Sequence, residues 1–159
     1  MSTTNEEKPI RMLVRHIRNV QDECGLLAER LIEQGRQDLA RTLLANSMLH
    51  DNSKFRGVEW EYLSEAAKVE YPEQFKAAVQ QHTLTNPHHP EYWGGIQHTP
   101  SVYVAEMVCD WKARSAEFGT DLRGWIKEKA TKRWDFPTQG KVYREIKEYL
   151  DLLLDATFT

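Results

Sequence analysis

The sequence predicts an all-α protein, a single-domain compact bundle of six or seven helices. Apolar residues recur at steps of three and four through most of the 159 residues, which is the spacing that lines one face of an α-helix. No stretch alternates apolar and polar residues over a length typical of a strand. The composition, with 40% hydrophobic and 28% charged residues, is typical of a chain that folds around one core.

Four helices are predicted in the first half of the chain. After a tail of residues 1–8 that we expect to be disordered, the helical domain spans residues 9–159. The second helix stops at Asp51-Asn52-Ser53, whose side chains compete for backbone hydrogen bonds, and the fourth follows Pro72, a residue that favours a helix start. The four helices cover Pro9 to about Gly35, Arg36 to Leu49, Val58 to Val69 and Glu73 to Thr83.

The second half begins with a loop, Thr85 to Pro100. Its prolines and glycines exclude a regular helix, yet it carries His88, His89, Tyr92 and Trp93, so it is a candidate site. Three further helices are predicted at Ser101 to Phe118, Leu122 to Trp134 and Lys141 to Asp155.

Charge and cysteine content narrow the function classes. A net charge of -3 gives no general attraction to phosphate backbones, so we expect no large nucleic acid as partner. Two cysteines inside apolar helical patterns predict a reducing, cytoplasmic location. The polar N-terminus and the lack of a long apolar run predict neither a leader nor a membrane partner. Trp125 and Trp134 leave room for a helix contact in a homodimer.

The histidines are clustered, which indicates a metal site. All six lie between positions 16 and 98, and imidazole together with carboxylate oxygens accepts divalent transition metals such as Mn, Fe, Co, Ni or Zn. His50 and Asp51 are adjacent at the end of a predicted helix. There they can converge on one ion, which neighbours about 100° apart inside a helix cannot do.

Two further candidates lie on predicted helices. His16 is three and four residues from Leu13 and Val20, so it points toward the core; the alternative is a core-edge histidine with one hydrogen bond. Asp110 lies in an apolar run and is costly to bury unless it is paired or bound to metal. Glu106, four residues earlier, shares its helix face.

The order His16, His50-Asp51, Asp110 resembles the HD superfamily of metal-dependent phosphohydrolases, whose ligand pattern is H…HD…D on an all-helical core. The resemblance covers Arg11 to Arg114. It implies one ion at these four residues, with positions left for water and a substrate oxygen.

Two motifs extend the resemblance. Residues 50–54 look like the HDxGK motif of the HD-GYP branch, with Lys54 as the phosphate-facing lysine and Ser53 in place of glycine. Residues 88–95 are similar to the HHE segment of that branch, with Pro90 inserted and the GYP triplet absent, and His82 matches an additional histidine of two-metal members. The chain also resembles a small family from phages and bacteria that combines HDxSKF and NxHHPExW motifs, here residues 50–55 and 86–93.

The resemblance implies a phosphohydrolase that cleaves a small nucleotide-like phosphoester through a metal-bound water, with one or two divalent ions. The implied metal ligands are His16, His50, Asp51, His82, His89 and Asp110. The implied catalytic groups are Lys54, Glu91 and Glu106, with Glu91 or Glu106 as general base or as a partner that orients a histidine. Together with the positions of the neighbouring residues, the resemblance leads us to expect substrate contacts at Lys54, Asn86, His88, Trp93 and Arg114.

Several alternatives stay open from the sequence. A di-iron oxygenase of the HD type uses the same ligand types and is distinguished by iron content and oxygen dependence. A non-catalytic HD-like module for a nucleotide or a metal predicts binding without turnover. Within the site, either His88 or His89 is the ligand, and Trp93 either stacks on a base or packs on the core.

Overall fold

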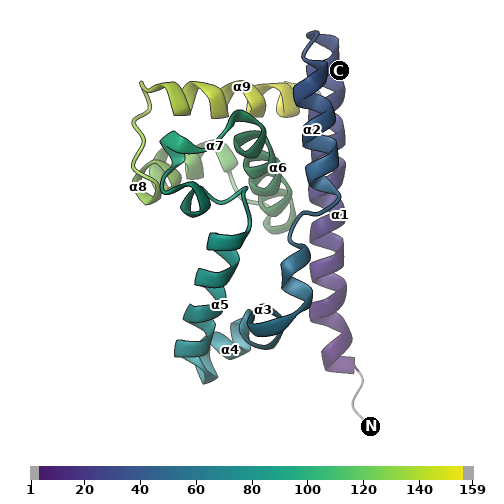
Figure 1. Ribbon diagram of the computed structural model, residues 1–159, viewed down its shortest axis with the longest axis vertical. Coiled ribbons are helices and arrows are strands. Elements are labelled where there is room, and N and C mark those ends of the chain that lie inside the picture. The colour runs from purple at the N-terminus through teal and green to yellow at the C-terminus, as the bar shows by residue number, and fades with distance from the viewer. Residues whose placement is uncertain (1–3, 156–159) are drawn as a thin grey trace.

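One long helix, α1 (Thr4–Glu33), runs along the molecule and packs against three other helices (Figure 1). The computed structural model describes residues 4–155, with side chains described from Pro9 to Leu154. All regular structure within residues 4–155 is helical, so the predicted all-α bundle is confirmed.

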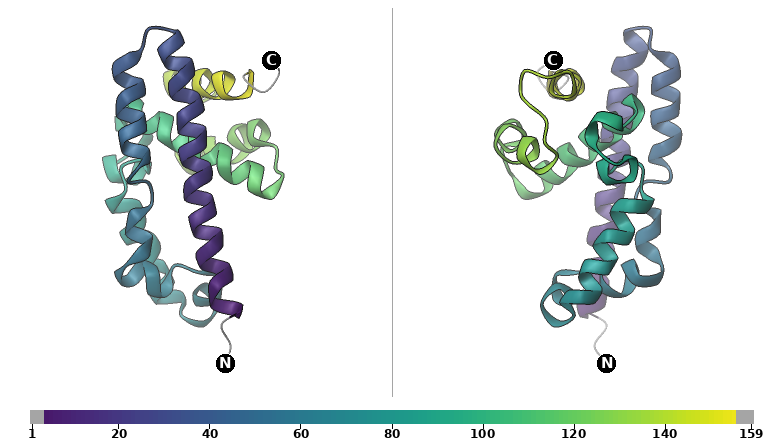
Figure 2. Two further views of the ribbon diagram at one scale, coloured as in Figure 1. Left: turned by 90° about the vertical axis from the view of Figure 1, so that its right-hand side faces the viewer. Right: turned by 60° about the vertical axis from the view of Figure 1, so that its left-hand side comes forward.

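A tight turn returns the chain from α1 into α2 (Gln37–Ser47), which packs beside α1 in the opposite direction (Figures 1 and 2). Gly35 makes this turn with a φ of 79°, a left-handed conformation that costs glycine little. The Arg36 amide then donates to the Leu31 carbonyl at 2.8 Å, which satisfies one of the last carbonyls of α1. The predicted helix boundary near Gly35 is therefore confirmed.

The apolar core lies where α1 and α2 meet α6 (Ser101–Phe118) and α9 (Lys141–Asp155). Figure 1 shows α9 crossing the end of the molecule opposite the N-terminus, with α6 passing through the middle. Burying one large apolar side chain stabilises the fold by roughly 1.5–3 kcal/mol. Fully buried members of the core include Leu27, Leu31, Leu43, Val108 and Tyr149.

Three shorter helices form a second group at the end of the molecule that carries the N-terminus (Figure 1). They are α3 (Gly57–Tyr62), α4 (Glu65–Glu70) and α5 (Pro72–Thr85), and both α3 and α4 pack against α5. As predicted, Pro72 stands at the start of α5, where its missing amide hydrogen costs no hydrogen bond.

The prediction of one helix over Val58 to Val69 is wrong, because the chain leaves the helical conformation at Leu63. Ser64 then begins α4, and its hydroxyl accepts a hydrogen bond from the Ala67 amide at 3.1 Å. Serine is a preferred residue at this position because its oxygen satisfies an amide that the first helical turn leaves free.

The predicted loop before α6 contains two short 3-10 turns, η2 (Pro90–Trp93) and η3 (Ile96–His98). Turn η2 packs against α5. Trp93 ties the loop to itself, because its indole nitrogen donates to the Pro87 carbonyl at 2.8 Å. The residues around the paired histidines are thereby held in a defined conformation.

The helix predicted over Leu122 to Trp134 is present, with a π turn inside it. It consists of α7 (Leu122–Trp125), the π turn η4 (Ile126–Ala130) and α8 (Thr131–Arg133). The rings of Trp125 and Trp134 lie 5.2 and 5.3 Å from the ring of Trp111 on α6. The two tryptophans that we considered for a homodimer contact therefore have an aromatic partner within their own chain.

Helix α1 starts five residues earlier than the predicted start at Pro9. A proline indicates a helix boundary but does not impose one, and α1 continues through Pro9. Residues 4–8 of the predicted tail are thus part of α1, and residues 1–3 lie outside the described residues.

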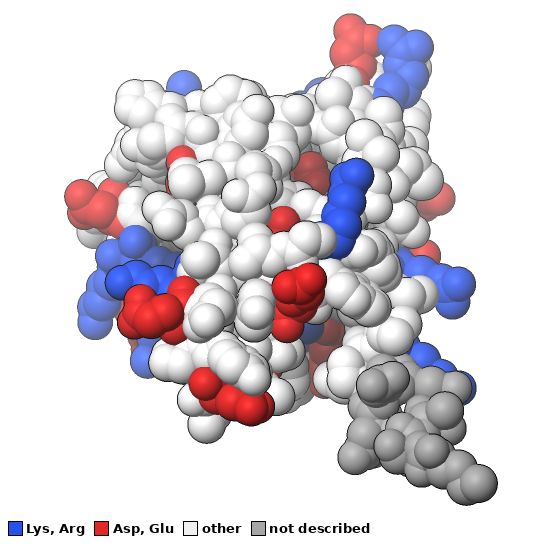
Figure 3. All heavy atoms as spheres, turned by 60° about the horizontal axis from the view of Figure 1, so that its bottom comes forward, with Lys and Arg blue, Asp and Glu red and all other residues white. Residues whose placement is uncertain are grey.

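Charges of both signs are scattered over the face shown in Figure 3, with broad uncharged areas between them. This pattern agrees with the small net charge of -3. Among the helices described, none combines the length and the apolar character needed to cross a membrane.

Candidate metal centre

Seven side chains from five segments meet beside the core, and we call this group the metal centre. The polar cluster lies where α1, the ends of α2 and α5, the loop before η2, and α6 come together. Its members are His16, His50, Asp51, His82, His88, His89 and Asp110. All seven were predicted from the sequence as ligands or substrate contacts, and whether they bind an ion stays a prediction.

The end of α2 explains how His50 and Asp51 both reach the centre. The helix stops at Ser47, and Asp51 takes a left-handed conformation with a φ of 54°. Aspartate tolerates this conformation better than most residues. The dipeptide therefore lies beyond the regular helix, as its stop signal predicts, and both side chains are buried.

Position A is the part of the centre formed by His16, His50, Asp51 and Asp110. The His16 Nε2 atom lies 2.9 Å from Asp110 Oδ1, and His50 Nε2 lies 3.8 Å from Asp110 Oδ2. Ligand atoms of His16, His50 and Asp51 fall within 4.8 Å of one another. Such spacing lets one ion contact all of them with small adjustments, since metal bonds to these atoms measure about 2.0–2.2 Å.

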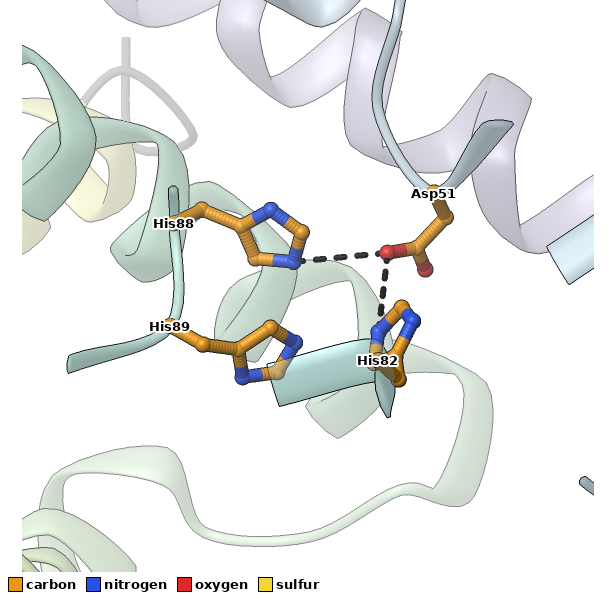
Figure 4. A group of neighbouring side chains, drawn as sticks. All are labelled: Asp51, His82, His88 and His89. Atoms are coloured by element: carbon orange, nitrogen blue, oxygen red, sulfur yellow. Dashed lines mark ion pairs between the residues drawn. The ribbon is translucent and has the colours of Figure 1, made fainter. Parts of the chain in front are cut away.

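Position B is formed by Asp51, His82, His88 and His89, whose ligand atoms also fall within 4.8 Å of one another. Figure 4 shows one oxygen of Asp51 facing two rings, His82 Nε2 and His88 Nε2, each at 3.3 Å. The ring of His89 lies beside those of His82 and His88, with centroids 4.8 and 4.3 Å away. Asp51 thus belongs to both positions, and the geometry brings His88 as well as His89 into the centre.

Three of the histidines donate a hydrogen bond to a glutamate through the ring nitrogen that does not face the centre. His16 Nδ1 donates to Glu117 at 2.9 Å, His50 Nδ1 to Glu106 at 2.9 Å, and His82 Nδ1 to Glu59 at 2.6 Å. His88 Nδ1 lies 3.4 Å from the same Glu106 oxygen. A neutral ring that donates through Nδ1 has an unprotonated Nε2, so these glutamates prepare the inward nitrogens to bind a cation.

The inward atoms are buried, and although carboxylate oxygens lie close to several of the nitrogens, none of these atoms makes a hydrogen bond of acceptable geometry. Within the described chain this holds for Nε2 of His16, His50, His88 and His89 and for Oδ1 of Asp51. Each such atom costs roughly 1–3 kcal/mol when it is left without a partner, so a group of five requires an explanation. A bound cation supplies one, and the mixed nitrogen and oxygen donors suit a divalent transition metal.

Electrostatics keep the carboxylates of the centre charged. Burial opposes the ionisation of Asp51, but the charges of His50 and Lys54 outweigh it and hold the pKa of Asp51 well below its usual range. The pKa of Asp110 is likewise lowered despite burial, through contact with His16 and the charge of His50. The centre therefore presents two carboxylates at neutral pH.

The pKa values of two histidines of the centre differ from the usual value in opposite directions. Burial opposes charge on His50, yet the neighbouring Asp51 and the hydrogen bond to Glu106 raise the pKa of His50 to about 9. Burial and the nearby His88 lower the pKa of His89 to about 3. Without an ion, His50 thus holds a proton that a metal has to displace, whereas His89 is already neutral.

Two predicted residues line the edge of the centre. The Lys54 ammonium lies 2.9 Å from Asp51 Oδ2, and its side chain is 18% exposed, so it reaches both the centre and solvent. Asn86 is buried, and its amide donates to Ser53 Oγ at 2.8 Å and to the His82 carbonyl at 2.9 Å. The contacts of Asn86 are therefore with the protein.

Three other predicted residues lie outside the seven-residue group. Glu91 accepts a hydrogen bond from the Trp134 indole at 3.0 Å, and Trp93 packs on Tyr103 with 5.4 Å between ring centroids. Arg114 is half exposed and donates to Glu117 at 3.2 Å, so it contacts His16 only through that carboxylate.

Sequence reasoning missed Glu59 and Glu117. Glu117 lies seven residues after Asp110, two helical turns along the same face of α6, and this periodicity was a usable signal. Glu59 gave no comparable signal, because it meets His82 only through the packing of α3 on α5. Glu106 was proposed as a base or an orienting group, and its bond to His50 fits the second role.

Comparisons with known proteins give one match that covers nearly the whole chain. No curated protein and no solved structure matches it. Residues 5–156 match a family described as "Family of unknown function (DUF5662)". The chain belongs to this family.

Proposed function

We propose that the protein is a metal-dependent phosphohydrolase that acts on a small, nucleotide-like phosphoester. One or two divalent ions of Mn, Fe, Co, Ni or Zn would be held at positions A and B. The proposal combines the arrangement of the metal centre with the resemblance of His16, His50-Asp51 and Asp110 to the HD superfamily.

One observation carries the proposal. Histidine nitrogens that are buried and unpartnered converge on Asp51 and Asp110, while glutamates bind the opposite nitrogens of the same rings. A hydrogen-bonded structural cluster would leave no such atoms unpaired. A carboxylate behind a ligating histidine fixes the ring orientation and raises its basicity, which is the common pattern at metal sites.

The position of each side chain in the centre suggests its role in hydrolysis. A divalent ion supplies Lewis acidity, which makes a bound water more acidic and offsets charge on a phosphoryl oxygen. Lys54 reaches both Asp51 and solvent, so its ammonium can hold a substrate phosphate at the edge of the centre. Glu59, Glu106 and Glu117 keep the rings in place. Asp51 orients Lys54 and contributes to both positions.

The test is hydrolysis by protein that has been stripped of metal and reloaded with each candidate ion. The panel contains an aryl phosphomonoester, an aryl phosphodiester, nucleoside mono- and triphosphates and cyclic nucleotides. We expect turnover of at least one class, absent in Asp110→Asn and retained in His98→Ala, which removes an exposed histidine outside the centre. Lys54→Gln is expected to keep its metal and to lose on the order of 100-fold in kcat/KM.

Other outcomes would replace the proposal. Metal binding without turnover of any phosphoester would favour a binding module. Iron-dependent consumption of oxygen would favour a di-iron oxygenase. Each result would contradict hydrolysis while leaving the metal centre itself in place.

A further inference from the structure

We propose that Glu59, Ser53 and Asn86 form a largely buried positioning unit that orients His82 and thereby sets the occupancy of position B. The inference rests on the metal centre of the proposed function and concerns which residues control its second ion. The hydrogen bonds of the unit reach none of His16, His50 and Asp110, so its loss is expected to affect position B more than position A.

The unit is a closed set of hydrogen bonds around one carboxylate. Glu59 Oε1 accepts from His82 Nδ1 at 2.6 Å and from Ser53 Oγ at 2.9 Å. Asn86 donates to Ser53 Oγ at 2.8 Å and to the His82 carbonyl at 2.9 Å. Glu59 is 4% exposed and Asn86 is 7% exposed, so water competes little for these bonds.

The unit links the two parts of the chain that supply position B. Ser53 lies in the 3-10 turn η1 (Asn52–Phe55), two residues after the ligand Asp51. Asn86 follows the last turn of α5, four residues after His82. Glu59 on α3 bonds to both segments and Asn86 joins them a second time, so the unit as a whole holds Asp51 and His82 at their distance.

Orientation of the His82 ring is the quantity that the unit controls. Rotation about χ2 of histidine is broad and roughly two-fold, so a ring without a fixed partner can present either nitrogen or carbon to the ion. The bond from Nδ1 to Glu59 selects one orientation and directs Nε2 toward Asp51 at 3.3 Å. Glutamine at position 59 keeps the size of the side chain but removes its charge, which weakens that selection.

Position A relies on other carboxylates. His16 bonds to Glu117, and His50 bonds to Glu106. Glu106 also lies near His88, so it serves both positions. Of these glutamates, Glu59 is the one whose histidine belongs to position B alone.

The test measures how many ions bind and how tightly. Metal-free full-length protein is dialysed against increasing Zn²⁺ or Mn²⁺, and bound ions per chain are counted by elemental analysis. Wild type is expected to bind two ions. Glu59→Gln is expected to bind the first ion as wild type does and the second about 10- to 100-fold more weakly. Glu61→Gln, an exposed change on the same helix α3, is the matched control.

A second variant covers the case in which Glu59→Gln fails to fold. Ser53→Ala removes one donor to Glu59 and leaves its charge, and it is expected to weaken the second ion on the order of 10-fold. If Glu59 merely stabilises the packing of α3 on α5, both variants bind two ions with wild-type affinity, and the inference is overturned. Equal weakening of both ions overturns it as well. A wild-type protein that binds no metal contradicts the proposed function too, which separates the two failures.

Discussion

The apolar core is fully buried and its side chains satisfy one another, whereas the metal centre is largely buried and leaves polar atoms without hydrogen bonds. Helices α1 and α6 contribute to both. On α1, His16 is followed by the core residues Val20 and Leu27, and on α6 the core residue Val108 precedes Asp110. Core side chains satisfy one another by contact, whereas the centre turns unpaired nitrogens and carboxylates toward a common point. The fold therefore uses its self-sufficient core to hold together a group of polar side chains that could take a metal ion.

The largest effect that this comparison predicts is stabilisation by metal. An ion that binds only the folded protein adds roughly 4 kcal/mol to the free energy of unfolding when its concentration is 1,000 times the dissociation constant. Urea unfolding of metal-loaded and chelator-treated protein measures the difference. Identical unfolding curves with and without metal would mean that the centre is complete by itself.

A somewhat smaller effect is expected in the core. Leu27 is fully buried, and Leu27→Ala is expected to lower the free energy of unfolding by about 3 kcal/mol, through lost burial and the cavity left behind. The number of ions bound by the folded variant should equal that of wild type. Loss of metal from a variant that is still folded would show that the two regions are not separable.

Changing the pH is a gentler perturbation, because every side chain stays in place. Above pH 6.5 the unfolded chain releases the His50 proton, whereas the folded metal-free protein keeps it up to about pH 9, so stability falls as pH rises through this interval. Below pH 6.5 the unfolded chain protonates His89, which the folded protein keeps neutral down to about pH 3, so stability falls there too.

We therefore expect the metal-free protein to be most stable near pH 6.5, as measured by denaturant unfolding across the pH range. Metal affinity is expected to rise between pH 6.5 and 9, since the ion competes with the His50 proton. A metal-free protein that gains stability over the same interval would contradict the assigned contacts of His50.

The smallest effect is expected at Glu117, whose side chain is 19% exposed and thus partly screened by water. Glu117→Gln weakens the support of His16 and is expected to lower the affinity of position A on the order of 10-fold, with position B unchanged. Asp38→Asn, at a 95% exposed carboxylate on α2, serves as control. Unchanged metal affinity at both positions would contradict a role for Glu117 in orienting His16.

Much of the fold was predictable, because helix periodicity is a local signal. The boundaries at Gly35 and Pro72 follow from residues that favour a helix end and a helix start. The break between α3 and α4 was missed although Ser64 is a good helix start, because apolar spacing continues across it. The π turn Ile126–Ala130 left no sequence signal that we recognise.

The side chains that face into the centre were also predictable from the sequence. The glutamates that hydrogen-bond to its histidines were less predictable. The residue types that can bind a metal and the helix end near Asp51 can be recognised in the sequence. Of the supporting glutamates, Glu117 shares a helix face with Asp110 and could have been found from the sequence, whereas Glu59 meets His82 only through the packing of α3 on α5. The sequence also could not distinguish His88 from His89. In the fold both rings enter position B, and His88 Nε2 is the one that contacts Asp51 and Asp110.

The central claim is that the centre holds metal, and elemental analysis of purified protein tests it most directly. Wild type is compared with His50→Ala, Asp51→Ala and the surface control His98→Ala after exposure to Mn, Fe, Co, Ni and Zn. We predict near-stoichiometric metal in wild type and His98→Ala, and its loss in the other two variants. A wild-type protein that stays empty at neutral pH with metal supplied would contradict the account.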